Sequence, residues 1–287
     1  MLLVIGKTGQ VATELALRAP DARFLGRDAV DLADPAACAA AIRAANPSAV
    51  INAAAYTAVD KAEEEEDLAT AVNGTSPTEM ARASDDLGIP FVQISTDYVF
   101  RGDGSEAWKP TDPTGPLGAY GRSKLIGEDG TRAAAGAHAI LRTSWVFSSH
   151  GNNFVKTMLR LTETRDALNV VEDQIGGPTP AGDIAAACLT IAGQLAQDPS
   201  KSGTYHFAGA PDVSWADFAR AIFAASGRSV TVTGIPASEY PTPAVRPANS
   251  RMDCSSLTAA FGIPRPDWQA GLCTVLNDLN ALKDSMK

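Results

Sequence analysis

The stretch Leu2-Leu-Val-Ile-Gly6-Lys-Thr-Gly9-Gln-Val-Ala12 decides the fold, because a short apolar run passes through a glycine turn directly into a helical pattern. In such a strand–turn–helix unit, glycine lets the backbone approach a phosphate, and a small third residue lets the helix pack on the strand. The free N–H groups of the first helical turn then attract negative charge. We predict a phosphate-binding turn at Gly6 and Gly9, with Ala12 in the packing position.

The tripeptide Gly6-Lys7-Thr8 also resembles the end of a P-loop, and this reading fails. A P-loop needs a second glycine five residues upstream of Gly6, where this chain has Met1. The expected strand also occupies the residues that would have to cradle the phosphate. An ATPase of this type is therefore excluded.

Beyond this turn, apolar runs alternate with helical patterns through the first half of the chain. Strands alternating with helices predict an α/β fold with a doubly wound, Rossmann-type parallel sheet. We expect strands at 2–5, 23–25, 49–54, 90–95 and 139–146, and helices at 10–18, 35–45, 63–73, 78–87 and from 120 to 128.

The pattern loosens after Phe147, and we expect a smaller C-terminal α/β substrate-binding region there. Ser214-Trp-Ala-Asp217 is typical of a capping box ahead of a helix. The predicted division is a dinucleotide-binding domain at 1–147, joined by later segments that return to it, and a second region at 148–287. Within the second region we expect strands at 168–172 and 204–208, helices at 184–195, 216–226 and 268–282, and an extended loop at 236–247.

Composition narrows the class of partner. The 24 Lys and Arg residues against 33 Asp and Glu residues give a formal charge of −9, which repels nucleic acid and anionic lipid. No apolar run reaches the roughly 18–20 residues of a membrane span, and no basic leader precedes the first strand. Four cysteines without close pairs and three dispersed histidines argue against a zinc site or a disulfide framework. We expect a cytoplasmic protein, a monomer or a homodimer, with a small-molecule substrate, and we read the run Glu63–Glu66 as a solvated helix face.

A second motif, Tyr120-Gly-Arg-Ser-Lys124, lies at the start of an expected helix. Its spacing places the phenol and the ammonium on one helix face. Tyrosine ionises near pH ~10 in isolation, and a nearby cation lowers that pKa, so Tyr120 becomes an acid–base group usable near neutrality. The pattern alone is common by chance.

Hydroxyl side chains follow at the end of another strand, in Ile94-Ser-Thr-Asp-Tyr-Val-Phe100. This strand end belongs to the sheet edge where open α/β sheets bind ligands. A hydroxyl of Ser95 or Thr96 there can hydrogen-bond a substrate carbonyl oxygen. The order of glycine turn, hydroxyl and Tyr–Lys pair predicts one reaction site.

These motifs, together with further segments, closely resemble the dTDP-4-dehydrorhamnose reductases, a family of the extended short-chain dehydrogenase/reductase superfamily. Asn52-Ala-Ala-Ala-Tyr-Thr-Ala-Val-Asp-Lys-Ala-Glu63 is far more specific than the Tyr–Lys pair. The resemblance spans nearly the whole chain. It rests on residues 6–12, 52–63, 95–100, 120–124, 142–147, 173–179 and 246–253.

The resemblance implies reduction of the C4 keto group of dTDP-4-dehydro-L-rhamnose, the last step of dTDP-rhamnose synthesis and so part of polysaccharide synthesis. Thr96 matches the family's catalytic hydroxyl, Tyr120 its proton donor and Lys124 its activating cation and ribose anchor. The residues expected at the coenzyme are Gly6, Gly9, Gln10, Val11, Arg27, Asp31, Leu32, Ala53, Ala54, Ala55, Tyr56 and Lys124. The resemblance also implies that 1–147 binds the coenzyme and that 148–287 largely binds the sugar nucleotide. The residues expected around the sugar nucleotide are Asp97, Tyr98, Trp145, Arg246, Asn249 and Ser250.

The choice between NADPH and NADH depends on the end of the second strand, Leu25-Gly-Arg27-Asp28. Arginine accommodates a 2′-phosphate, whereas a carboxylate binds the ribose 2′-hydroxyl. Arg27 therefore favours NADPH, and Asp28 keeps NADH as the alternative.

Some relatives are expected to bind magnesium through glutamates, and this chain departs from that pattern. Glu14 matches the first ligand, but Asp183 stands where the second glutamate is expected, and no glutamate follows Asp267. We expect no metal site.

Two other readings remain. A dehydratase or epimerase of the same superfamily is disfavoured because Thr96-Asp97 is followed by Tyr98, where the dehydratases carry a catalytic glutamate. Another nucleotide-sugar 4-ketoreductase stays open. A non-catalytic NADP-binding regulatory subunit, similar to the β-subunit of methionine adenosyltransferase, is disfavoured because hydroxyl, tyrosine and lysine are all present.

Overall fold

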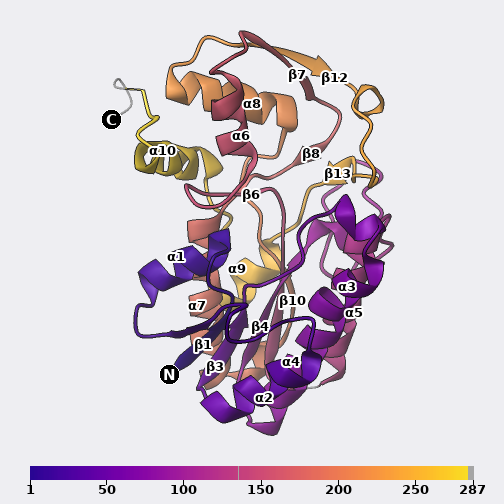
Figure 1. Cartoon of the computed structure of the whole chain (residues 1–287), viewed down its shortest axis with the longest axis vertical. Helices are drawn as coiled ribbons and strands as arrows, with labels where there is room; N and C mark the ends of the chain where they lie inside the picture. Colours follow the sequence, from indigo (N-terminus) through magenta and orange to yellow (C-terminus); the bar gives the residue numbers. More distant parts are fainter. Residues whose placement is uncertain (135, 284–287) are drawn as a thin grey trace.

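The computed structural model describes residues 1–134 and 136–283, and its lower lobe is built on one parallel sheet (Figure 1). The strand order is β10-β5-β4-β3-β1-β2, and every neighbouring pair is parallel. The doubly wound α/β prediction is confirmed. The strands are β1 (Leu2–Ile5), β2 (Arg23–Leu25), β3 (Ala49–Asn52), β4 (Phe91–Thr96), β5 (His138–Thr143) and β10 (Gly203–His206).

Helices cover both faces of this sheet (Figure 1). On one face α1 (Gln10–Arg18) packs against α7 (Ala181–Gln197), which in turn contacts α9 (Ser255–Phe261). On the other face α4 (Ser76–Asp86) packs between α2 (Pro35–Ala45) and α5 (Ala119–Ala133). Each face buries its own apolar core, one around Leu15 and Ile184 and the other around Ile42 and Met80.

The strand order reverses beside β1, and this reversal places the site. The chain leaves β1 for β2 on one side and returns through α2 to β3 on the other. In register, Ile5 lies beside Leu25 and Asn52, so the loops that follow β1 and β3 diverge from one point. Such a switch point opens a crevice at the carboxyl edge of an α/β sheet.

The upper lobe has its own core. Its helices are α6 (Phe154–Leu161), α8 (Trp215–Ser226) and α10 (Trp268–Asp278), which pack with the parallel pair β7 (Ala167–Val171) and β12 (Thr231–Ile235) around Phe218 and Leu272 (Figure 1). Short strands join the lobes. They are β8 (Ile175–Gly176), which pairs with β11 (Val213–Ser214) and β13 (Asn249–Ser250), and β6 (Val146–Phe147), which pairs with β9 (Thr179–Pro180).

The segment between β3 and α4 differs from the single helix predicted at 63–73. It comprises a 3₁₀ turn η1 (Lys61–Glu63), α3 (Glu66–Thr70) and a π turn η2 (Ala71–Thr75) that continues into α4. The prediction that the run Glu63–Glu66 is solvated is confirmed, since Glu63 and Glu64 are exposed and Glu65 and Glu66 are half-buried, although the run does not form one continuous helix. Glu63 accepts a hydrogen bond from the Ala119 amide at 2.8 Å, and Glu66 pairs with Arg122 at 2.7 Å.

Other boundaries differ less. The sequence analysis missed α6, α9 and β12, and the last helix ends at Asp278 rather than at residue 282. The cap at Ser214 is present, because its hydroxyl accepts the Asp217 N–H at 2.9 Å. The remaining 3₁₀ turns are η3 (Asp97–Val99), η4 (Pro199–Lys201) and η5 (Ala237–Glu239). Within the described residues, no helix is both long and apolar enough to span a bilayer.

Candidate active site

The turn after β1 requires its first glycine. Gly6 has a φ of +114°, a backbone angle that residues other than glycine rarely adopt. A Cβ there would also lie 3.3 Å from both the Ala53 carbonyl carbon and the Ala54 amide nitrogen. Gly9 then precedes α1 without any side-chain cap, so the first-turn N–H groups are left for an anionic ligand. This turn therefore fits the pyrophosphate of a dinucleotide.

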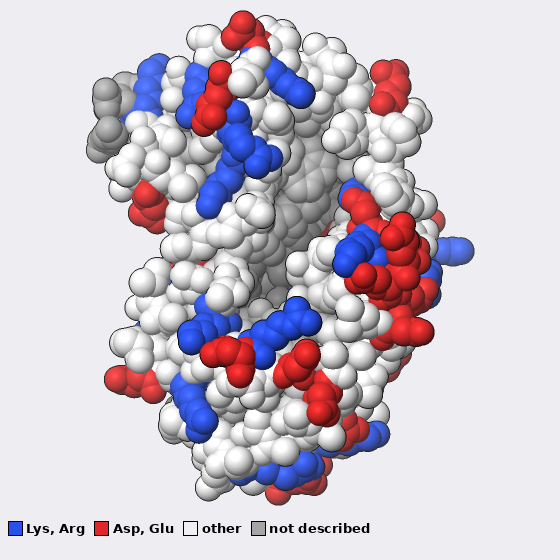
Figure 2. Space-filling model, in the orientation of Figure 1, with Lys and Arg blue, Asp and Glu red and all other residues white. Residues whose placement is uncertain are grey.

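A cavity of about 1060 Å³ opens at this switch point, within the hollow between the lobes (Figure 2). Its wall includes the glycine turn, the end of β2, the loop after β3 and the inner end of α5. Every residue that the sequence predicted at the coenzyme lies on this wall: Gly6, Gly9, Gln10, Val11, Arg27, Asp31, Leu32, Ala53, Ala54, Ala55, Tyr56 and Lys124.

Charged side chains gather where β2 ends on this cavity. Arg27 and Lys7 are exposed, and each meets a carboxylate only at 4.0 Å: Arg27 that of Asp31, and Lys7 that of Asp28. Exposed pairs at this separation are weak. Both cations are therefore free to turn toward a ligand phosphate.

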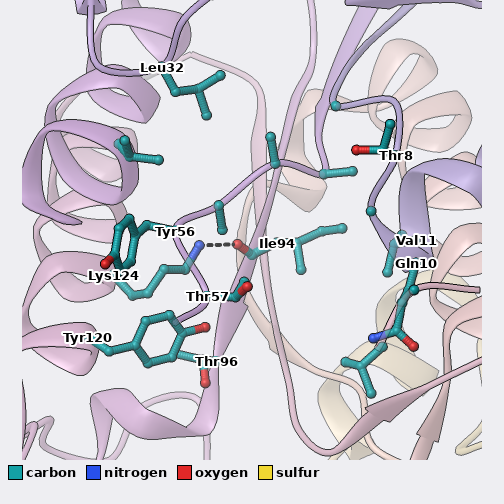
Figure 3. A pocket seen from close by; sticks show the side chains of 18 of the residues that line it. Thr8, Gln10, Val11, Leu32, Tyr56, Thr57, Ile94, Thr96, Tyr120 and Lys124 are labelled. Atoms are coloured by element: carbon teal, nitrogen blue, oxygen red, sulfur yellow. Dashed lines mark hydrogen bonds between the residues drawn. The ribbon is translucent and has the colours of Figure 1, made fainter. Parts of the chain in front are cut away.

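Tyr120, Lys124 and Thr96 meet on the same wall (Figure 3). Lys124 is buried and its Nζ donates a hydrogen bond of 2.7 Å to the Ile94 carbonyl oxygen. Thr96 ends β4 and lies beside the Tyr120 hydroxyl, whereas Gln10 lies across the cavity (Figure 3). The predicted grouping of phenol, ammonium and hydroxyl is therefore present in space.

The electrostatics differ from the prediction that the lysine lowers the tyrosine pKa. Burial, followed by the charge of Asp97, raises the pKa of Tyr120 to about 12, and the neighbouring Thr96 hydroxyl opposes that rise. Lys124 is directed at Ile94, and burial lowers the pKa of its own ammonium to about 8. In this state Tyr120 keeps its proton at neutral pH, which suits a proton donor rather than a base.

A second cavity of about 960 Å³ adjoins the first and shares Tyr98 and Trp145 with it. Trp145 has a φ of +51°, a strained value for a bulky side chain of the kind found at ligand sites. Its ring stacks on Trp215 with centroids 3.5 Å apart, so an aromatic wall faces the cavity. Arg246 and Ser250 line the same cavity from the loop that precedes α9.

Polar contacts connect this loop to the lower lobe. The Asp60 carboxylate accepts hydrogen bonds from the Arg246 guanidinium at 2.8 Å and from the Ala244 amide at 3.1 Å. Arg246 holds the pKa of Asp60 below its usual range, although burial opposes this as the largest single influence. Ser250 donates to Asp97 at 2.5 Å, and burial raises the pKa of that carboxyl to about 6.

One predicted substrate residue lies apart from the others. Asn249 is buried and lines neither cavity. Its amide donates to the carbonyl oxygens of Glu106 at 2.8 Å and Asp103 at 3.3 Å. Asn249 therefore holds a loop, and its contact is with backbone rather than with the site.

Sequence reasoning missed Asp60 and Trp215. Asp60 lies inside the specific segment 52–63, so its signal was available but was assigned no role. Trp215 is hidden within the capping sequence that follows Ser214, and no local pattern brings it to Trp145.

Glu14, which matches the first magnesium ligand expected in some relatives, contacts other side chains in this structure. Glu14 pairs with Arg18 and lies 3.4 Å from the His150 ring, so its carboxylate faces cationic and imidazole partners. Across residues 1–134 and 136–283, no three His, Cys, Asp or Glu side chains are grouped as metal ligands.

Known proteins resemble this chain over nearly its whole length. Residues 1–281 match the family described as the RmlD substrate binding domain. A dTDP-4-dehydrorhamnose reductase of Sinorhizobium fredii is 48% identical over 277 residues, covering 93% of this chain and 94% of that protein.

Two solved structures are also similar over nearly the whole chain. The dTDP-4-dehydrorhamnose reductase of Clostridium acetobutylicum superposes with a TM-score of 0.90 at 36% identity, covering 97% of this chain and 99% of that one. The enzyme of the same name from Bacillus anthracis, solved in complex with NADP, gives 0.89 at 33% identity, covering 96% and 98%.

Proposed function

This chain belongs to the RmlD substrate-binding-domain family, and from that membership we propose that it is a dTDP-4-dehydrorhamnose reductase. It reduces the C4 ketone of dTDP-4-dehydro-L-rhamnose to the alcohol of dTDP-L-rhamnose, the last step of dTDP-rhamnose synthesis. One observation carries the proposal: Tyr120, Lys124 and Thr96 lie on the wall of the cavity that opens at the glycine turn, and this cavity shares Tyr98 and Trp145 with a second one.

The first cavity holds the coenzyme. The uncapped start of α1 at Gly9 and Gln10 binds the pyrophosphate, and Asp31 with Leu32 adjoins the adenine. Ala53, Ala54, Ala55 and Tyr56 run beside the ribose and nicotinamide, with Lys124 at the ribose. When bound, NADPH supplies the hydride that reduces C4.

Tyr120 supplies the proton. Its phenol stays protonated at neutral pH, because burial raises its pKa to about 12. As C4 gains hydride, the ketone oxygen becomes an alkoxide and takes the Tyr120 proton, so the C=O group ends as CH–OH. The Thr96 hydroxyl donates a hydrogen bond to the same oxygen. The Lys124 ammonium, which is directed at the Ile94 carbonyl oxygen in this structure, is the cation proposed to stabilise the phenolate that Tyr120 becomes.

The second cavity holds the sugar nucleotide. Asp97, Tyr98 and Trp145 adjoin the sugar, and Ser250 keeps the buried Asp97 in place. The Arg246 guanidinium binds the diphosphate, for which its planar donor pairs are suited. Asn249 acts only by fastening β13, the strand that also contains Ser250, to the loop at Asp103 and Glu106.

The two cavities correspond to two regions of the chain. Residues 1–147, with β10, α7 and α9 returning to them, bind the coenzyme, and most of 148–283 binds the sugar nucleotide. The last four residues of the predicted region 148–287 lie outside the described part. Buried free thiols at Cys38, Cys188 and Cys254 agree with the expectation of a reducing cytoplasm. A monomer or a homodimer stays a prediction.

NADPH is the proposed coenzyme, with NADH as the alternative. Arg27 and Lys7 lie at the end of the cavity where a 2′-phosphate would bind. Asp28 beside them is the feature that would admit NADH.

The test is an assay of coenzyme absorbance with several nucleotide 4-ketosugars, with the product configuration at C4 determined. Loss of NADPH absorbance with dTDP-4-dehydro-L-rhamnose, giving dTDP-L-rhamnose, supports the proposal. Preferred turnover of another nucleotide sugar makes the protein a different 4-ketoreductase. Tight NADPH binding without turnover of any ketosugar makes it a regulatory subunit and contradicts the proposal.

A further inference from the structure

A stripe of ionisable side chains runs along the inner face of α5. Tyr120, Lys124 and Glu128 are each four residues apart, so they lie on one side of the helix. The proposed reaction uses the first two and gives Glu128 no role. Yet Glu128 is fully buried, which a carboxylate tolerates only when it is paired and hydrogen-bonded.

Glu128 is held from three directions. Arg142 on β5 donates from Nε to one carboxylate oxygen at 2.9 Å and from Nη2 to the other at 2.6 Å, a two-pronged pair. Ser95 on β4 donates from its hydroxyl at 2.6 Å, and Arg132 on α5 reaches the carboxylate at 3.3 Å. Arg142 is itself 2% exposed, so the pair is secluded from water.

These contacts tie Glu128 to the reaction site through one strand. Lys124 donates to the carbonyl oxygen of Ile94, and Glu128 accepts from the next residue, Ser95. The residue after that is Thr96, whose hydroxyl lies beside Tyr120 (Figure 3). Three successive residues of β4 therefore hold the lysine, the glutamate and the reactive hydroxyl in fixed relation.

The charge of Glu128 acts on Lys124. Burial lowers the pKa of the Lys124 ammonium to about 8, and the Glu128 charge is the influence that opposes this loss. Burial would also neutralise Glu128, but Arg142 and Ser95 together hold the pKa of the carboxyl below its usual range. Glu128 therefore stays ionised within its pair with Arg142, one helical turn from the lysine.

The other ionisable groups around this stripe have different roles. From η3, Asp97 is buried beside Thr96, and from β10, His206 lies 3.4 Å from Arg142, with its pKa lowered to about 3 by burial and by that cation. The loop after β3 contributes Tyr56, which donates to Glu65. The groups that the remaining neighbouring elements place here have other contacts. Glu63 of η1 accepts from the Ala119 amide, Glu66 of α3 pairs with Arg122, and in α4 Glu79 pairs with Arg82 while Asp85 lies beside Gly136. The neutral Asn73 of η2 donates to Ser123.

We propose that Glu128 is a positioning residue of the reduction: held by Arg142 and Ser95, its carboxylate keeps the buried Lys124 ammonium charged and anchored on β4 beside Thr96. The inference rests on the proposed function, because Glu128 acts through Lys124. Loss of its charge removes the carboxylate that opposes deprotonation of the buried lysine, which then keeps only its hydrogen bond to the Ile94 carbonyl oxygen. A neutral Lys124 can no longer stabilise the Tyr120 phenolate.

The direct test is the titration of Lys124 in the coenzyme-free protein, followed by NMR of ¹³Cε-labelled lysine and assigned with Lys124→Arg. We expect Glu128→Gln to lower the Lys124 midpoint by about one pH unit or more. Because Glu128→Gln strands the buried Arg142 and can unfold the chain, the double variant Glu128→Gln/Arg142→Met removes both charges and is the second arm. The matched control is Glu66→Gln, which breaks the half-exposed pair between Glu66 of α3 and Arg122 of α5.

Steady-state assays with NADPH and dTDP-4-dehydro-L-rhamnose give the second readout. In each Glu128 variant the alkaline limb of kcat should move to lower pH by as much as the Lys124 midpoint of that variant moves, and in the control it should not move. An unchanged Lys124 midpoint in a folded Glu128 variant would overturn the inference, since a purely structural residue changes stability alone. A wild-type protein without turnover refutes the proposed function instead, and the NMR titration still decides whether Glu128 governs Lys124.

Discussion

The two adjoining cavities share Tyr98 and Trp145 but are built in different ways. The wall of the first includes bare backbone at strand ends, as at the turn of Gly6, where an added Cβ would lie 3.3 Å from the Ala53 carbonyl carbon. The second is walled by side chains that reach across the two lobes, as in the Asp60–Arg246 pair and the Trp145–Trp215 stack. We expect the backbone at the strand ends to fix where the coenzyme lies, and the side-chain pairs to govern which sugar nucleotide is accepted.

This contrast predicts that the largest single effect comes from the reacting group of the first cavity. Tyr120→Phe removes the proton donor and leaves the ring in place, so kcat should fall by about 10²- to 10⁴-fold. NADPH affinity should stay within about twofold, because the backbone wall is intact. Coenzyme oxidation and a fluorescence titration of NADPH measure the two quantities. Retention of more than about a tenth of wild-type activity would place the proton donor elsewhere.

A smaller effect is expected in the second cavity. Arg246→Ala removes the guanidinium proposed to bind the diphosphate, so KM for the sugar nucleotide should rise about 10- to 100-fold with little change in kcat. NADPH affinity should not change. Arg160→Ala is the matched control, since Arg160 is an exposed residue of α6 that lines neither cavity. An equal rise in KM in the control would remove the special role of Arg246.

The first cavity was the more predictable of the two. Gly6, Gly9, Tyr120 and Lys124 are recognised from local spacing, because the strand–turn–helix unit and the helical repeat of four residues fix their relative positions. The parallel sheet followed from alternating strands and helices for the same reason. The sign of the Tyr120 pKa shift did not follow, because it depends on burial and on Asp97, and on where Lys124 actually points.

The second cavity could not be predicted in this way. Asp60 and Arg246 are 186 residues apart, and the partner of each is decided by how the lobes pack. The same holds for Trp215 against Trp145, and for Asn249, which the family pattern suggested for the substrate but which binds backbone.

The free energy of unfolding should depend on pH through Asp97, a buried residue that lines the first cavity beside Tyr98. Burial raises its pKa to about 6, so the folded state holds a proton that the unfolded chain has already lost, and stability falls as pH rises toward and through 6. Wild type should lose about 1–2 kcal/mol more than Asp97→Asn between pH 5 and pH 8. Urea unfolding at both values measures this difference. Parallel stability curves for the two proteins would show that Asp97 ionises normally.

The smallest effect is expected at the exposed end of the first cavity. Arg27→Ala should lower the preference for NADPH over NADH, measured as a ratio of kcat/KM, by about three- to tenfold, because a solvated cation contributes little. Asp28→Ala should raise the same ratio. If both substitutions leave it unchanged, the end of β2 does not select the coenzyme.

The central claim is that C4 of the sugar receives hydrogen from the coenzyme while Tyr120 protonates the oxygen. The most direct measurement is NMR of the product formed from dTDP-4-dehydro-L-rhamnose with NADPH deuterated at nicotinamide C4 on the transferred face. The account predicts one deuterium on C4 of dTDP-L-rhamnose with wild type and almost no product with Tyr120→Phe. Product that carries only solvent hydrogen at C4, or equal product from the Tyr120 variant, would contradict it.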